Sequence, residues 1–152
     1  MSYIGIDPGK NGGIAWISSG WNGVNVIKMP HTEKGIAELF KEMSGLGELL
    51  DMYACLEEVH SMPRQGVSST FKFGTNYGFL RACLTIYNIP FETVTPQIWQ
   101  REFIHTVSET KTEHKNKLKA VAQQLFPGQK ATLATADALL LAEYCRRKYQ
   151  NK

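Results

Sequence analysis

The sequence predicts an α/β fold in which an antiparallel set of strands is extended by strands that run parallel. Within the first 28 residues, apolar runs are separated by Gly12-Gly13 and Trp21-Asn22-Gly23, and such turns are typical of an antiparallel meander. Two later apolar runs, residues 52–59 and 91–94, each follow a helical pattern. A helix between two strands favours a parallel crossover, because parallel strands need a long connection.

Five strands are expected, at residues 2–7, 12–18, 23–28, 52–59 and 91–94. In the first of them, alternation places Tyr3, Gly5 and Asp7 on one face of the sheet. Pro8-Gly9 then forces the chain to turn. The first strand therefore presents a carboxylate at its C-terminal tip.

Five helices are expected: one after Thr32, a short one opened by Thr95-Pro96, and three over residues 68–88, 112–126 and 133–149. Thr32 suits the N-cap of the first helix, which Gly45 and Gly47 close. Pro96 suits the first helical position, where its missing N–H leaves no bond unmade. No repeat or linker interrupts the pattern, so we expect a single domain over residues 1–152.

The composition is that of an ordinary globular protein, with 43% hydrophobic and 20% charged residues among 152. No apolar run approaches the roughly 20 residues that span a membrane, and no signal peptide is evident, so a cytosolic protein of a bacterium or a phage-infected host is expected. Cys55, Cys83 and Cys145 lack C-x-x-C spacing and are expected to be buried free thiols. The formal charge of +3 permits a nucleic-acid partner, and solvated helix faces explain its basic clusters equally well.

Three acids stand where the fold could bring them together. Asp7 ends the first strand, Glu57 ends the fourth, and Asp137 opens the last helix among alanines that suit close packing on a sheet. Glu57 and Glu58 alternate in direction, so only one of them can share a face with Asp7. Carboxylates at matching strand ends suit a hard cation such as Mg²⁺. The alternatives are a turn cap at Asp7, strand-end glutamates in water, and a helix-terminal acid at Asp137.

The ordered set of motifs resembles that of the RuvC-like Holliday-junction resolvases. It comprises I-G-I-D-P-G at Ile4–Gly9, L-E-E-V-H at Leu56–His60, V-T-P-Q at Val94–Gln97 and A-D-A-L-L-L-A-E-Y at Ala136–Tyr144. The M-P-x-Q-G-V loop at Met62–Val67 is similar to that of the bacteriophage-type crossover-junction endodeoxyribonucleases. Each motif alone is weak, whereas their order across the whole chain is specific.

This resemblance implies a ribonuclease H-like fold, with a five-stranded mixed sheet whose first three strands are antiparallel and with helices on both faces. It implies a homodimer that cuts opposed strands of a four-way DNA junction, using Mg²⁺ or Mn²⁺. Asp7, Glu57 and Asp137 match three metal-binding acids of that family. The implied reaction is two-metal phosphodiester hydrolysis, in which one ion activates water and the other stabilises the leaving oxygen.

One ligand expected from the resemblance is missing. The family usually has an Asp or His about three residues before the last acid, where residues 133–135 of this chain are Leu, Ala and Thr. Substitutes are sought at Glu58, His60 and Glu109. Glu143 is a poorer substitute, because six residues along a helix turn it about 240° from Asp137. An inactivated variant is the other explanation that stays open.

The residues expected to contact DNA are Arg64, Gln65, Lys72, Asn76, Lys111 and Lys115. Arg64 and Gln65 follow the Glu57 strand in a loop that suits phosphate contact, and a plain mobile loop fits as well. Lys72 and Asn76 lie between aromatic residues that suit base stacking, the core or a dimer interface. Lys111 and Lys115, by analogy with resolvases, are also expected to be catalytic cations.

Two further classes of function fit parts of the pattern. A non-catalytic junction-binding protein would keep the fold and the basic surface without a complete set of acids. A ribonuclease H-like ATPase or sugar kinase needs two such domains, for which 152 residues are too few. A related nuclease that acts on flaps or RNA is the main alternative to a junction resolvase.

Overall fold

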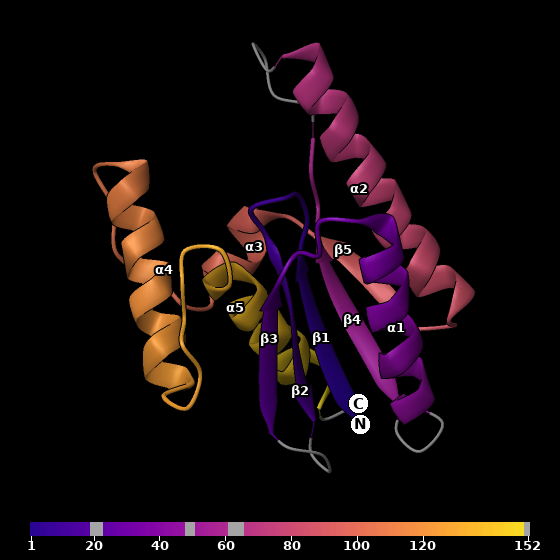
Figure 1. Cartoon of the computed structure of the whole chain (residues 1–152). Helices are drawn as coiled ribbons and strands as arrows, with labels where there is room; N and C mark the ends of the chain where they lie inside the picture. The colour runs from indigo at the N-terminus through magenta and orange to yellow at the C-terminus, as the bar shows by residue number, and fades with distance from the viewer. Residues whose placement is uncertain (19–22, 48–50, 61–65, 151–152) are drawn as a thin grey trace.

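The centre of the protein is a five-stranded sheet with the strand order β3-β2-β1-β4-β5 (Figure 1). The computed structural model describes residues 1–18, 23–47, 51–60 and 66–150. The strands are β1 (Ser2–Asp7), β2 (Gly13–Ser18), β3 (Val24–Lys28), β4 (Met52–Glu57) and β5 (Phe91–Val94). Neighbours among β1, β2 and β3 are antiparallel, whereas β4 runs parallel to β1 and β5 runs parallel to β4. The predicted α/β class and mixed sheet are confirmed.

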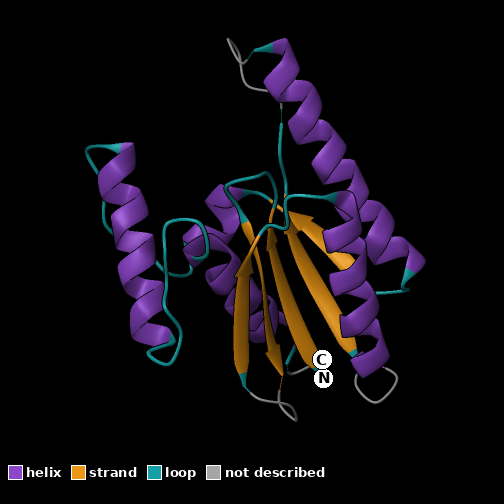
Figure 2. Cartoon of the chain, in the orientation of Figure 1, coloured by secondary structure: helices purple, strands orange, loops and turns teal. Residues whose placement is uncertain are grey.

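Helices cover both faces of this sheet (Figure 2). They are α1 (Glu33–Gly47), α2 (Val67–Ile86), α3 (Pro96–Gln100), α4 (Lys111–Leu125) and α5 (Ala136–Tyr149). On one face α1 and α2 pack over the sheet, and on the other α5 lies against β1, β2 and β4. Helix α4 packs against α5.

Strand alternation divides the core into two clusters, as the pattern of β1 predicts. Ile4 and Ile6 are buried against α1 and α2, where Phe40 contributes a large buried ring. Tyr3 points to the opposite face and packs with α5. The three cysteines are buried and free, as expected.

Helix α5 lies unusually close to the sheet. A Cβ atom on Gly5 of β1 would overlap the backbone of Ala138 and Ala142. On the neighbouring strand, a Cβ atom on Gly13 would come within 3.6 Å of the Ala138 side chain. The alanines predicted to form a flat face therefore bring α5 directly onto β1 and β2. This contact fixes the start of α5 beside the tip of β1, because Gly13 pairs with Asp7.

Two predicted boundaries are wrong by a few residues. Strand β4 ends at Glu57 rather than at residue 59. Helix α5 begins at Ala136 rather than at residue 133, because the residues before it form a separate turn. In that turn the Thr132 N–H donates to Thr135 Oγ1 at 3.0 Å, and the Ala136 N–H donates to the Thr132 carbonyl at 2.9 Å.

Other local predictions agree with the structure. Thr32 caps α1, since its Oγ1 accepts a 3.1 Å hydrogen bond from the Gly35 N–H. Pro96 stands in the first turn of α3. Trp21 and Asn22, in the turn expected between β2 and β3, lie outside the described residues.

In the described ranges, no helix is both long enough and apolar enough to cross a membrane.

Candidate active site

Three elements bring the predicted acids to one edge of the sheet. The parallel pairing of β1 with β4 places Ile6 beside Leu56, so Asp7 and Glu57 end neighbouring strands at the same edge. Asp137 lies in the first turn of α5 and is only 9% exposed. The charges of Glu57 and Asp137 both act on Asp7. The fold thus puts the three acids near one edge of the sheet, and their role as a metal site stays a prediction.

The Asp7 carboxylate is buried beside two other acids. Among the described residues, it accepts no hydrogen bond and forms no ion pair within 4 Å. Burial raises the pKa of Asp7 well above its usual value, and the negative charges of Glu57 and Asp137 raise it further. The positive charge of Lys115 opposes this effect. A cation bound beside this buried carboxylate would favour its ionised form.

Glu57 is held by the indole ring of Trp99. Trp99 Nε1 donates a 2.8 Å hydrogen bond to Oε2 of Glu57. Burial raises the pKa of Glu57 to about 7; the Trp99 hydrogen bond and Lys115 oppose this, whereas the charge of Asp137 adds to it. Near neutral pH this carboxyl group is therefore partly protonated and partly ionised, and a cation would favour the ionised form.

Asp137 faces a basic residue of α4. Lys115 Nζ lies 3.9 Å from Asp137 Oδ2, with 57% of the lysine side chain exposed. Burial raises the pKa of Asp137, while the charges of Lys115 and His114 lower it. His114 is anchored in turn, because its Nε2 lies 2.8 Å from Oε1 of Gln100. The first turns of α4 thus place positive charge at the edge of the acidic site.

A tight glycine turn follows Asp7. Gly9 has a φ of +96°, a left-handed conformation that a side chain would strain, and the Gly12 N–H closes the turn on the Gly9 carbonyl at 3.0 Å. Helix α2 supports the turn from outside. There Asn76 Oδ1 accepts a 2.7 Å hydrogen bond from the Gly9 N–H, and the Phe73 ring lies against Gly9.

The donor set suits a hard divalent cation. The site offers carboxylate oxygens, which Mg²⁺ and Mn²⁺ prefer. Three carboxyl groups lie there, and Lys115 is the lysine whose charge acts on them. In the ranges that the structure describes, however, no three His, Cys, Asp or Glu side chains are gathered closely enough to hold a metal ion as they stand. The residues therefore fit the cation by chemistry and charge, without a closed ligand cluster.

The substitutes considered for the fourth ligand have other contacts in the structure. Glu58 pairs with His60 at 3.5 Å, and its charge acts on Tyr77 of α2, which lies across the sheet from α5. Glu109 lies in the loop before α4, where its N–H donates to Glu113 Oε2. The residues at 133–135 belong to the turn before α5 and not to its first helical turn.

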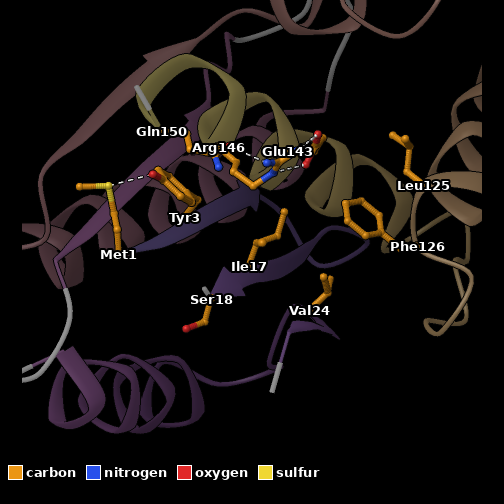
Figure 3. Close-up of a pocket in the computed structure, with 10 residues that line it drawn as sticks. All are labelled: Met1, Tyr3, Ile17, Ser18, Val24, Leu125, Phe126, Glu143, Arg146 and Gln150. Carbon is orange, nitrogen blue, oxygen red and sulfur yellow. Dashed lines mark hydrogen bonds and ion pairs between the residues drawn. The ribbon is translucent and has the colours of Figure 1, made fainter. Parts of the chain in front are cut away.

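Glu143 lies away from the three acids, toward the start of β1. It lines a cavity of about 720 Å³ together with Tyr3, near the start of β1 (Figure 3). There its Oε1 accepts hydrogen bonds from Arg146 at 2.7 Å and from Arg147 at 2.8 Å. Burial raises the pKa of Glu143, and these two arginines outweigh that effect and lower it. Glu143 is thus a structural anion.

The residues predicted to contact DNA occupy separate places. Lys72 is exposed on α2, and Lys111 is exposed at the first residue of α4, one turn before Lys115. Asn76 is engaged with the turn after Asp7. Arg64 and Gln65 lie outside the described residues. A role in DNA contact stays a prediction for all of these residues.

Sequence reasoning missed three residues that shape the site. Trp99 reaches Glu57, and Gln100 reaches His114, so α3 contacts both flanks of the acidic edge. The signal was present: Trp99 and Gln100 lie two and three residues after the V-T-P-Q motif, and His114 stands beside Lys115. Their contacts join distant parts of the chain, which no local periodicity encodes.

No model of a protein family matches the sequence, and no curated protein matches it. Among solved structures, RuvC of Thermus thermophilus in complex with a Holliday junction substrate is similar, with a TM-score of 0.63 and 16% identity over 99% of this chain and 95% of that one. Another Thermus thermophilus RuvC structure has the same score and identity, over 99% and 96% of the two chains. A Fowlpox virus resolvase with its substrate Holliday junction DNA scores 0.47 at 14% identity, over 99% and 97%. The likeness to RuvC shows that this chain has the ribonuclease H-like fold that its motifs predict.

Proposed function

We propose that this chain is a divalent-metal-dependent endonuclease that resolves four-way DNA junctions. The observation that carries the proposal is the convergence of Asp7, Glu57 and Asp137 at one edge of a RuvC-like sheet, with Lys115 beside them. The substrate class follows the Thermus thermophilus RuvC of the same fold, which was solved with a Holliday junction. Hydrolysis of a phosphodiester bond needs this combination of carboxylates and cations.

The three acids hold the cations, of which two per site are expected from the resemblance. Asp7 ends β1, which pairs with the strand of Glu57 and packs against the helix of Asp137, so we take it as the ligand that the two cations share. When bound, Mg²⁺ or Mn²⁺ neutralises phosphate charge and makes an attacking water more acidic. Glu57 at the end of β4 and Asp137 in the first turn of α5 would supply the other carboxylate ligands.

The basic residues of α4 act on the DNA backbone. Lys115 is half-exposed and reaches Asp137, so its ammonium group can contact a phosphate oxygen next to the acids. Lys111 lies about one turn earlier on α4 and extends this positive edge. Together they orient the scissile phosphate and stabilise the charge that builds up on it during cleavage.

A homodimer supplies the second active site that two opposed strands require. Helix α2 supports this assembly, because only Leu80, Cys83 and Leu84 of its 20 residues are buried. Near its start, Val67 and Phe71 are 87% and 75% exposed. Figure 1 shows this end of α2 projecting past the edge of the sheet that carries the acids. Exposed apolar side chains of this kind mark a contact surface.

The experiment compares wild type with Asp7→Asn on a synthetic four-way junction in Mg²⁺ and in Mn²⁺. We expect paired nicks in opposed strands from wild type, and binding without cleavage from the variant. Asp51→Asn is the matched control, because Asp51 is an exposed acid at the other end of β4. The same assay includes a flap and an RNA–DNA hybrid. Faster cleavage of the flap or the hybrid than of the junction would overturn the proposed substrate. Binding of the junction by wild type without cleavage in either metal would overturn the proposed nuclease activity.

A further inference from the structure

The indole of Trp99 is tied to one of the three proposed metal-binding carboxylates. Its Nε1 donates to Glu57 Oε2 at 2.8 Å, and the whole residue is 0% exposed. In the described part of the chain, no other hydrogen bond reaches the Glu57 carboxylate. One oxygen of this carboxylate is therefore fixed by the fold, and the other oxygen is left for a ligand.

The donor itself has a fixed position. Helix α3 begins directly after β5, and Val94 at the end of β5 pairs with Glu57 across the sheet. This pairing brings the single turn of α3 over the tip of β4. Phe103 packs against Trp99 in an edge-on arrangement, with 6.4 Å between ring centroids. Burial on all sides, rather than this one ring contact, restricts the indole, so its N–H points to one place.

We propose that Trp99 is a positioning residue of the metal centre, whose N–H holds Glu57 in the orientation that offers its second oxygen to the cation. The inference deepens the proposed function and rests on it, because it takes Glu57 as a ligand. A free glutamate side chain samples several rotamers, and only some of them direct an oxygen at the ion. Groups that orient a ligand in this way typically change metal affinity by about 10- to 100-fold when they are removed.

Trp99 also fills space in the core, and the variants separate this role from positioning. Trp99→Phe keeps an aromatic ring and removes the N–H. Phe103→Leu disturbs the same apolar cluster and leaves the hydrogen bond intact. Trp16→Phe removes an indole from β2, on the opposite face of the sheet. If only packing mattered, Phe103→Leu would resemble Trp99→Phe.

The first test measures the affinity of the purified full chain for Mn²⁺ alone, from the free Mn²⁺ signal in electron paramagnetic resonance. We expect Trp99→Phe to weaken binding by about tenfold or more, and the two controls to stay within about twofold of wild type. Binding by Trp99→Phe that equals wild type would overturn the inference and leave the proposed function standing. A wild type that binds no Mn²⁺ would overturn both.

The second test needs no variant of Trp99 that folds. In the wild type, the indole N–H resonance of Trp99 reports the hydrogen bond, and Glu57→Gln assigns it. Saturating Mg²⁺ draws electron density from the carboxylate and weakens this bond, so we expect the resonance to move upfield while that of Trp16 stays in place. A Trp99 resonance that does not change when Mg²⁺ binds would contradict the positioning role.

Discussion

Lys115 Nζ lies 3.9 Å from Asp137 Oδ2, so helix α4 places a positive charge beside the buried acid in the first turn of α5. The lysine side chain is 57% exposed, whereas that of Asp137 is 12% exposed. The charge of Lys115 also lowers the pKa of Asp7 and of Glu57, against the larger effect of burial. One flexible cation thus acts on all three acids and still reaches the solvent from which DNA approaches.

Replacing Lys115 by Met is expected to reduce cleavage of a four-way junction by about 100-fold, because the phosphate loses a cation where charge builds up. Junction binding should weaken only slightly, since one backbone contact among several is lost. Single-turnover cleavage and a binding titration measure the two effects separately. Lys119→Met is the control, because Lys119 is exposed one turn further along α4. Equal cleavage by both variants would contradict a catalytic role for Lys115.

The pH dependence of Mg²⁺ binding follows from the raised pKa values of the acids. Burial raises the pKa of Glu57 to about 7 and that of Asp7 well above its usual value, so protons compete with the cation in this range. We expect Mg²⁺ affinity and cleavage to fall steeply as the pH decreases below about 7. Raising the Mg²⁺ concentration should move the midpoint to lower pH, which a set of pH–rate profiles tests. A midpoint near 4.5 that does not move with the Mg²⁺ concentration would contradict the raised pKa of Glu57.

Without metal, the stability of the fold should depend on pH in the opposite direction to metal binding. Between pH 4.5 and about 7, the folded state keeps a proton on Glu57 that the unfolded chain releases, so stability falls as the pH rises. At about pH 8 Glu57 is ionised in both states, so the full cost of burying its charge lowers the stability of the folded protein. Glu57→Gln removes the charge and is expected to stabilise the metal-free protein by up to roughly 3 kcal/mol, while it abolishes cleavage.

Urea unfolding with and without Mg²⁺ measures this difference. Glu58→Gln is the matched control, because Glu58 is the next residue and pairs with His60 away from the acids. Added Mg²⁺ should stabilise wild type and leave Glu57→Gln unchanged. A Glu57→Gln variant that is less stable than wild type at about pH 8 would show that Glu57 carries no charge penalty.

The sequence predicted the parts of this site that depend on local pattern. Alternation in β1 placed Asp7 on the face of α5, and the alanines around Asp137 predicted a buried acid. The contacts of Trp99 could not be predicted, because they join residues 42 positions apart through the packing of α3 on β4. The start of α5 was wrong for a related reason: side-chain hydrogen bonds within Thr132–Thr135 stabilise a turn that competes with the helix.

The close contact between β1 and α5 makes a further prediction, for Gly5→Ala. The added methyl group would overlap the backbone of Ala138 and Ala142, which cannot move aside as a flexible side chain can. We expect a loss of about 3 kcal/mol or more in unfolding free energy. Gly78→Ala on α2 is the control, because none of the described residues outside its own helix turns lies within 4 Å of the added Cβ atom. This variant should gain roughly 0.5–1 kcal/mol.

The same substitution tests whether the fold positions the site. Any relief of the Gly5→Ala overlap moves α5 away from β1 and separates Asp137 from Asp7, so a folded fraction of the variant should bind Mn²⁺ more weakly than wild type. Gly78→Ala should bind it normally. Unchanged Mn²⁺ affinity in folded Gly5→Ala would mean that Asp137 does not depend on this contact for its place. The small residues of β1 and α5 are therefore expected to govern metal binding and stability together.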